Sequence, residues 1–322
     1  MAKKYILPDT HFGEIERPND QVHAINSFLD HAADADAEVL HIGDYVELGP
    51  VANLGMVRRE IGKTLAAFSH YQAKTGRPIQ VVRGNHEPSL TNELLESELT
   101  PGVRHQIHNT MLVDEKDGVV LHHGDLADVK NGNLADYLAT YKGNDSKALI
   151  EFFEEKERDT PSKYSEDRQL YHAHNMIFVW DVMRILQKFG TSLETQLAIY
   201  DWFARRAFRN KVEESIKTKK VIPGAPAEFT FNTWLMDQTN AWAIVQGHTH
   251  LPSHITWENQ DRSRKAIIAN AGSIYTTARA PTAVILDTDA RSSTLVAYRD
   301  GAWRADNTMV AEDDPKLFIP NL

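Results

Sequence analysis

Residues 79–87 read Ile-Gln-Val-Val-Arg-Gly-Asn-His-Glu, and this stretch decides the fold class. The run from Ile79 to Val82 predicts a short strand, and Gly84-Asn85-His86-Glu87 follows where that strand would end. Glycine lets the backbone turn sharply, while the Asn85 amide and the His86 imidazole offer metal-binding and proton-transfer groups. Because open α/β sheets place their ligand sites at the carboxyl ends of strands, the stretch predicts a site of this kind.

Four more motifs of the same character follow expected strands elsewhere in the chain. They are Asp9-Thr10-His11, Gly43-Asp44-Tyr45-Val46-Glu47, His122-His123-Gly124-Asp125 and Gly247-His248-Thr249-His250. Asp9 and His11 lie two residues apart, so both side chains point to one side of an extended strand end, and His248 and His250 repeat this spacing. The Asp44 carboxylate can bridge two cations. Together the motifs predict a pair of divalent ions that clamps a phosphoryl group during in-line displacement.

The composition limits which metals and partners fit. None of the 322 residues is a cysteine, so any metal is held by nitrogen and oxygen ligands. Imidazole and carboxylate suit Mn, Zn, Fe or Ni better than Ca or Mg, and we expect two divalent ions with manganese as the first choice. A formal net charge of −10 argues against a protein that coats nucleic acid non-specifically. No segment approaches the roughly 18 apolar residues of a membrane span, and we expect a cytoplasmic location.

The chain is organised as an α/β framework with a helical insertion. Strand and amphipathic-helix patterns alternate through residues 1–125, which predicts a sheet with largely parallel central strands. From residue 126 to residue 240 strand patterns vanish and helical stretches take over, at 133–142, 146–156, 170–189 and 194–217. After Trp242 the strands resume, the last of them spaced by turn residues as in an antiparallel meander.

The ordered motifs resemble those of the calcineurin-like metallophosphoesterase superfamily, whose pattern is D-x-H, G-D-x-x-D/E, G-N-H-D/E, H and G-H-x-H. The resemblance spans Asp9 to His250. It implies a four-layer α-β-β-α sandwich with the metal pair at the strand ends. Residues 1–125 and 241–322 would form this metallophosphoesterase core, and residues 126–240 a helical cap insertion.

The resemblance also implies a role for each site residue. One ion would be held by Asp9, His11, Asp44 and His250, and the other by Asp44, Asn85, His123 and His248. A hydroxide bridging the ions would be the nucleophile. His86 would protonate the leaving oxygen or stabilise the developing charge, and Glu47 would orient His86 as a carboxylate–imidazole pair.

The adjacent pair His122-His123 leaves a choice of ligand, because neighbouring strand residues face opposite sides. We choose His123, since the His-Gly step of the superfamily begins there, and interpret His122 as a structural histidine. His41 lies one strand pleat from the predicted site, where it either supports the ligands or serves the core.

Two subfamilies narrow the substrate. The segments Asp44–Glu47 and Val82–Glu87 look like those of the Ser/Thr phosphoprotein phosphatases. Leu48, however, stands where that family has a phosphate-binding arginine, which argues against a protein phosphatase. The His-Gly-Asp motif, the helical cap and Gly-His-Thr-His resemble the layout of UDP-2,3-diacylglucosamine hydrolases, which typically have Arg where this chain has His86.

The sequence therefore predicts a two-metal hydrolase of phosphate esters, acting on a small-molecule phosphoester or nucleotide-like substrate. A phosphodiesterase or pyrophosphatase is the first choice, because an insertion over the site can contact a second substituent. A phosphomonoesterase is the alternative. A non-catalytic scaffold that keeps the fold is the competing class, although every ligand type is present here.

Overall fold

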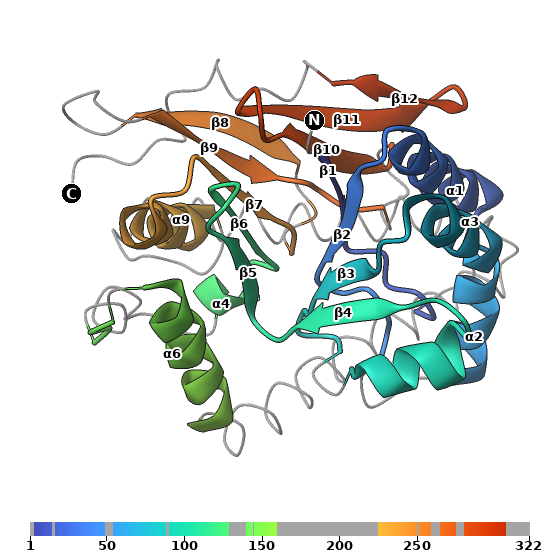
Figure 1. Cartoon of the computed structure of the whole chain (residues 1–322), viewed down its shortest axis with the longest axis horizontal. Helices are drawn as coiled ribbons and strands as arrows, with labels where there is room; N and C mark the ends of the chain where they lie inside the picture. Colours follow the sequence, from blue (N-terminus) through green and yellow to red (C-terminus); the bar gives the residue numbers. More distant parts are fainter. Residues whose placement is uncertain are drawn as a thin grey trace, which may run out of the picture.

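The computed structural model describes residues 3–14, 17–48, 54–87, 90–128, 140–143, 145–159, 225–248, 250, 252–258, 265–274 and 280–306. Two sheets form the centre of the molecule (Figure 1). The first has seven strands in the order β12-β11-β10-β1-β2-β3-β4, and the second has five in the order β5-β6-β7-β9-β8.

In the first sheet β1 to β4 run parallel and β10 to β12 form an antiparallel meander on the other side of β1. Their bounds are β1 (Lys3–Pro8), β2 (Glu38–Ile42), β3 (Ile79–Val82), β4 (His105–His108), β10 (Thr282–Asp287), β11 (Ser292–Arg299) and β12 (Ala302–Ala305).

In the second sheet β6, β7 and β9 run parallel, and β5 and β8 are antiparallel edge strands. Their bounds are β5 (Met111–Asp114), β6 (Val119–His122), β7 (Ala243–Gln246), β8 (Ser253–Glu258) and β9 (Lys265–Asn270). Strands β5 and β6 form a hairpin whose turn contains Lys116, Asp117 and Gly118.

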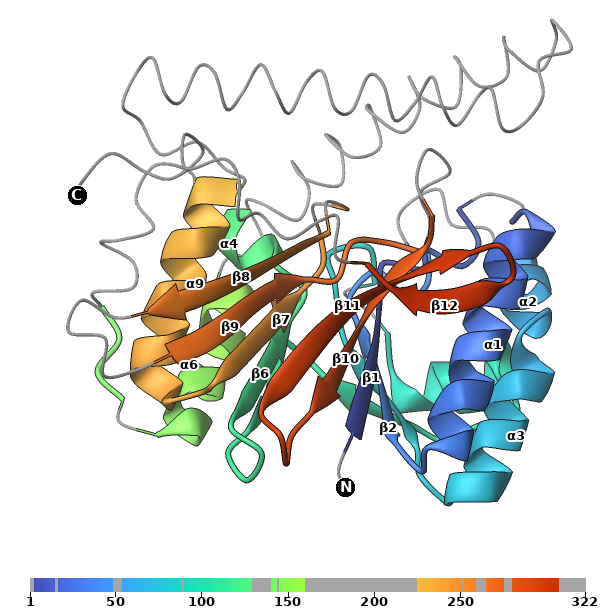
Figure 2. The ribbon, with the colours of Figure 1, turned by 90° about the horizontal axis from the view of Figure 1, so that it is seen from above.

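Helices cover the outer face of each sheet, so the fold is a four-layer sandwich, as predicted (Figure 2). On the first sheet lie α1 (Asn19–Asp34), α2 (Leu54–Gly62) and α3 (Leu65–Thr75), followed in the chain by the π-helix η1 (Leu94–Leu99). On the second lie α4 (Asp125–Asp128), α6 (Ser146–Asp159) and α9 (Ala225–Thr239). Burial of one helix face against a sheet accounts for this layering.

Three apolar clusters fill the three spaces between the layers. Phe28 of α1 and Phe68 of α3 pack with Val39 and Val81 of the first sheet. Between the two sheets, Ile6, Leu40 and Val82 of the first sheet pack with Leu121 and Val245 of the second. Phe153 of α6 and Phe231 of α9 pack on the outer face of the second sheet. The central strands are therefore covered on both faces, which agrees with their continuous apolar sequences.

Only part of the predicted cap falls within the described residues. Helix α6 begins where the helical pattern at 146–156 predicted, and it packs with α9 as the outer layer of the second sheet. The predicted helical stretches at 170–189 and 194–217, and most of 133–142, lie outside the described residues. The division into core and cap stays a prediction. Within the described ranges, no helix has the length and apolar character needed to cross a membrane.

A buried lysine joins the two sheets at the end of β1 away from the motifs. The Nζ atom of Lys4 lies 2.8 Å from Oε2 of Glu38, 2.8 Å from Oδ2 of Asp114 and 2.9 Å from Oδ2 of Asp117. Glu38 belongs to the first sheet, whereas Asp114 and Asp117 belong to the β5–β6 hairpin of the second. The lysine side chain is 1% exposed, so its charge is compensated by these three carboxylates rather than by water.

Candidate metal centre

All five motifs follow the carboxyl ends of parallel strands, and both sheets contribute. The first sheet supplies the residues after β1, β2 and β3, and the second supplies those after β6 and β7. Since β1 to β3 point the same way within their sheet, and β6 and β7 within theirs, the motifs meet along one edge of the sandwich.

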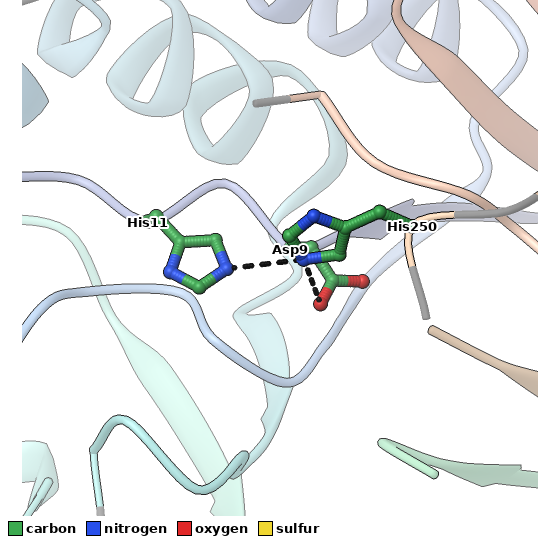
Figure 3. Close-up of side chains that lie close together, drawn as sticks. All are labelled: Asp9, His11 and His250. Carbon is green, nitrogen blue, oxygen red and sulfur yellow. Dashed lines mark hydrogen bonds and ion pairs between the residues drawn. The ribbon is translucent and has the colours of Figure 1, made fainter. Parts of the chain in front are cut away.

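The first cluster consists of Asp9, His11 and His250 (Figure 3). Nε2 of His250 lies 3.3 Å from Oδ1 of Asp9 and 3.4 Å from Nε2 of His11. Nε2 of His11 is also 3.5 Å from Oδ2 of Asp44. Asp9 and His11 come from one motif and His250 from another, so residues distant in the chain present their ligand atoms to one point.

The second cluster consists of Asp44, Asn85, His123 and His248. Nε2 of His123 lies 3.1 Å from Oδ1 of Asn85, 3.1 Å from Oδ2 of Asp44 and 3.2 Å from Nδ1 of His248. The same oxygen of Asp44 therefore lies within 3.5 Å of a histidine nitrogen in each cluster. This places Asp44 between the two groups.

These separations fit metal coordination. Ligand atoms about 2.1 Å from a common ion stand about 3.0–3.4 Å from one another in octahedral or tetrahedral geometry. The spacings of both clusters, 3.1 to 3.5 Å, match that range closely. The donor set is imidazole, carboxylate and amide oxygen, which suits a first-row divalent metal. The residues present therefore fit a pair of such ions.

The backbone is in the left-handed region at five of these residues. The φ angles are +41° at Asp9, +45° at His11, +46° at Asp44, +70° at His248 and +55° at His250. Few residues other than glycine adopt such angles, and a concentration of them marks a site where the surrounding structure imposes the geometry. No local sequence pattern indicated this feature.

Backbone N–H groups hold both aspartates in place. The N–H of His248 donates to both oxygens of Asp9, at 3.2 and 3.1 Å, and the N–H of His86 donates to Oδ1 of Asp44 at 3.0 Å. A Cβ at Gly84 would collide with the Asp44 carboxylate, and one at Gly247 would collide with that of Asp9. The glycines of these motifs therefore admit the carboxylates as well as allowing turns.

The charges of the clusters suit metal ligation. For Asp44, burial favours the neutral acid, but the neighbouring histidines outweigh burial and hold its pKa well below the ordinary value. Burial lowers the pKa of His11 well below its ordinary value, which leaves a neutral imidazole with a lone pair. Burial also opposes charge on His123, but Asp44 outweighs it and raises the pKa of His123. A cation binding here would displace that proton.

His86 and Glu47 form a close pair beside the first cluster. Nδ1 of His86 lies 2.6 Å from Oε2 of Glu47, and Nε2 lies 3.9 Å from Oδ2 of Asp44. The His86 ring meets the His11 ring edge to face at 4.7 Å. Burial lowers the pKa of His86, but Asp44 and Glu47 outweigh burial and raise the pKa to about 10. Asp44 and Glu47 therefore favour the form of His86 that is protonated on both ring nitrogens.

The two adjacent histidines face opposite ways. His123 lies in the second cluster, whereas Nε2 of His122 lies 2.7 Å from Oδ1 of Asn232 on α9. The His122 ring also packs edge to face on Phe231. His41 is buried beneath the clusters, with Nε2 2.8 Å from the hydroxyl of Thr10, between Asp9 and His11.

Three further side chains lie near the clusters, and the sequence predicted no role for them. Oε2 of the buried Glu14 lies 3.3 Å from Nδ1 of His11. Glu14 follows His11 by three residues, and this short separation in the sequence was a signal that could have identified it. Glu87 accepts the N–H of Gly84, and burial followed by repulsion from Asp44 raises its pKa to about 8. Ser273 donates its hydroxyl to the carbonyl of Asp9 from a loop without any motif.

Comparison with known proteins gives a family match. Residues 3–252 match the family described as calcineurin-like phosphoesterase. No curated protein matches the chain.

Several solved structures resemble the chain at low identity. Zn²⁺-complexed Vps29 from Entamoeba histolytica is 13% identical, with 94% of this chain and 97% of that chain covered and a TM-score of 0.35. GAP50, the anchor in the inner membrane complex of Plasmodium, is 9% identical, with 96% and 90% covered and a TM-score of 0.35. A dimetal phosphatase from Danio rerio is 11% identical, with 92% and 93% covered and a TM-score of 0.33. Likenesses at this level carry no argument about chemistry.

Proposed function

The chain belongs to the calcineurin-like phosphoesterase family, and on this premise we propose that it is a two-metal hydrolase of phosphate esters. The observation that carries the proposal is the position of Asp44. Its Oδ2 atom lies 3.5 Å from Nε2 of His11 and 3.1 Å from Nε2 of His123, so it joins the two clusters of potential ligands. A carboxylate in this position can bridge a pair of adjacent cations of the kind that two-metal hydrolases use.

We assign the ligands as the family resemblance implies. Asp9, His11, Asp44 and His250 would hold one ion, and Asp44, Asn85, His123 and His248 the other. The ions would polarise a phosphoryl oxygen and lower the pKa of a water molecule. Manganese is the first choice, with zinc, iron or nickel as alternatives.

His86 supplies a proton in this proposal. Glu47 holds Nδ1–H at 2.6 Å, which leaves Nε2–H as the donor on the side of the ring that faces Asp44. Nε2–H can then protonate a leaving alkoxide, which is a poor leaving group without a proton. The group formed by His11, Glu47 and His86 is also compact enough for a cation, but the short bond between Glu47 and His86 favours a proton there.

A phosphodiester or pyrophosphate is the first substrate class, and a phosphomonoester the second. This order rests on the predicted cap in the insertion at 126–240, because an element over the site could contact a second substituent. The resemblance to UDP-2,3-diacylglucosamine hydrolases stays a prediction, as does the cytoplasmic location. A non-catalytic scaffold is the competing hypothesis, and the intact ligand set argues against it.

The test is hydrolysis of a substrate panel by the full chain. Aryl phosphodiester, aryl phosphomonoester, cyclic nucleotide and UDP-sugar are each supplied with Mn²⁺, Zn²⁺ or Ni²⁺ after chelation. We expect metal-dependent turnover with the diester ahead of the monoester. Higher kcat/KM for the monoester would reverse the substrate order. Bound metal without turnover of any substrate would support the scaffold.

A further inference from the structure

We infer that Asn232 of α9 is a positioning residue for the second metal cluster, an inference that rests on the proposed function. Asn232 lies outside every motif, and the two hydrogen bonds of its side chain go to residues that are not themselves ligands. Its amide bridges the two strand ends that carry His123 and His248.

Two hydrogen bonds form the bridge. Nε2–H of His122 donates to Oδ1 of Asn232 at 2.7 Å, and Nδ2–H of Asn232 donates to Oε1 of Gln246 at 2.8 Å. His122 ends β6 immediately before His123, and Gln246 ends β7 two residues before His248. One amide on α9 therefore ties together the ends of both strands.

Burial makes these bonds difficult to replace. His122 and Asn232 are 0% exposed and Gln246 is 3% exposed, so water does not readily substitute for a lost partner. A buried polar group left without its hydrogen bond destabilises the folded chain, because water cannot reach it to replace the lost partner. The packed Phe231, beside Asn232 on the helix, holds the His122 ring edge to face at a centroid distance of 5.1 Å. The His122 ring thus has one favoured orientation.

The second cluster depends on how these strand ends sit relative to each other. Nε2 of His123 and Nδ1 of His248 are 3.2 Å apart although they belong to different strands. The ladder between β6 and β7 continues past the strand ends in one bond, from N–H of Gly247 to the carbonyl of His123 at 3.0 Å. Asn232 braces the same junction from the helix side. The first cluster takes Asp9 and His11 from the end of β1 and Asp44 from the end of β2, and only His250 from the segment after β7. The effect should therefore fall mainly on the second cluster.

The test measures Mn²⁺ affinity by calorimetry in the full chain, with one site removed at a time. His250→Ala weakens the first site and leaves the second for measurement, and His248→Ala does the reverse. We expect Asn232→Leu to weaken binding about 10- to 100-fold in the His250→Ala background, the size seen when supports of metal ligands are removed. In the His248→Ala background we expect a change of less than about twofold on the same scale.

Controls separate positioning from general damage. Leu235→Ala on the same helix removes a buried apolar side chain, and we expect a lower melting temperature with unchanged relative affinity of the two sites. If Asn232→Leu does not fold, Asn232→Ala, which adds no bulk, replaces it in the same two affinity measurements. Equal weakening in both backgrounds, or none, overturns the role of Asn232. Absence of Mn²⁺ binding by the unmutated chain overturns the proposed function itself.

Discussion

Nδ1 of His86 lies 2.6 Å from Oε2 of Glu47, so the imidazole is held by one nitrogen and presents the other toward Asp44. The pair combines two motifs that follow different strands, β2 and β3. In the proposed function, this pair would handle proton transfer while the neighbouring side chains hold the metal ions.

Replacing His86 should matter most for substrates with poor leaving groups. We expect His86→Ala to lower kcat about 10²- to 10⁴-fold for an alkyl phosphodiester, because the departing alkoxide loses its proton donor. The loss of kcat should be much smaller for a nitrophenyl ester. Glu47→Gln should also lower kcat for both esters, but by less than His86→Ala does. The measurement is kcat across esters of graded leaving-group pKa. Equal losses for all esters would contradict the acid role.

Removing divalent metal should destabilise the folded chain. A ligand present at 100 times its Kd stabilises the folded state by about 2.7 kcal/mol, and here it would also neutralise buried carboxylates. We expect a chelator to lower the melting temperature and Mn²⁺ to restore it. Asp44→Asn, which alters the carboxylate shared by both clusters, should respond weakly to Mn²⁺ and lose most of its kcat. An unchanged melting temperature after chelation of the unmutated chain would count against the metal pair.

A methyl group at Gly84 should damage the site while one at Gly62 should not. The Gly84 Cβ would collide with the Asp44 carboxylate, whereas nothing lies within 4 Å of a Cβ at Gly62 in α2. We expect Gly84→Ala to weaken Mn²⁺ binding by about 10-fold or more, since ligand orientation is lost. Gly62→Ala should leave binding unchanged and raise stability by up to about 1 kcal/mol. Calorimetry and thermal melts of both variants decide the matter.

The Lys4 cluster should stabilise the fold over a defined pH window. Burial opposes the ammonium, but Asp114, Asp117 and Glu38 outweigh burial and raise the pKa of Lys4 above its ordinary value. Its contribution is therefore complete below about pH 10.4 and is lost only at higher pH. Burial favours protonation of Asp114, but the bond from Lys4 outweighs burial and lowers its pKa, so that contribution is lost as pH falls below about 3.9.

Lys4→Met tests this window. We expect it to lower the free energy of unfolding by about 1–3 kcal/mol at neutral pH, because three partly exposed carboxylates lose their common partner. The difference from the unmutated chain should be constant between about pH 5 and 9 and should shrink below about pH 4, where Asp114 becomes protonated. Urea unfolding at several pH values measures it. A difference that grows toward low pH would contradict the assignment.

The strands and motifs were predictable because they follow local patterns. Ile79–Val82 and Val119–Leu121 are apolar runs that the sandwich buries, and the polar motifs after them are short and recognisable. Strand β4 was missed because His105-Gln106-Ile107-His108 lies at the edge of its sheet and carries little apolar character. The pattern that reveals a buried strand is weak there.

Contacts between residues far apart in the chain could not be predicted from the sequence. The orientation of His122 depends on Phe231 and Asn232, more than a hundred residues away, and only the family resemblance favoured His123. The approach of Glu14 to His11 depends on how the chain turns after β1. The resemblance could name ligand types, but the 3.1 to 3.5 Å spacings between their atoms arise from strand packing.

The left-handed backbone at Asp9, His11, Asp44, His248 and His250 restricts which amino acids can replace them. Among residues with a side chain, Asp, Asn and His are the ones most often tolerated at such angles. Glutamate and cysteine also bind metals, yet either would add backbone strain to any change in coordination. If this centre is redesigned for another metal, the choice of residues at these five positions is therefore limited to aspartate, asparagine and histidine unless the loops themselves are rebuilt.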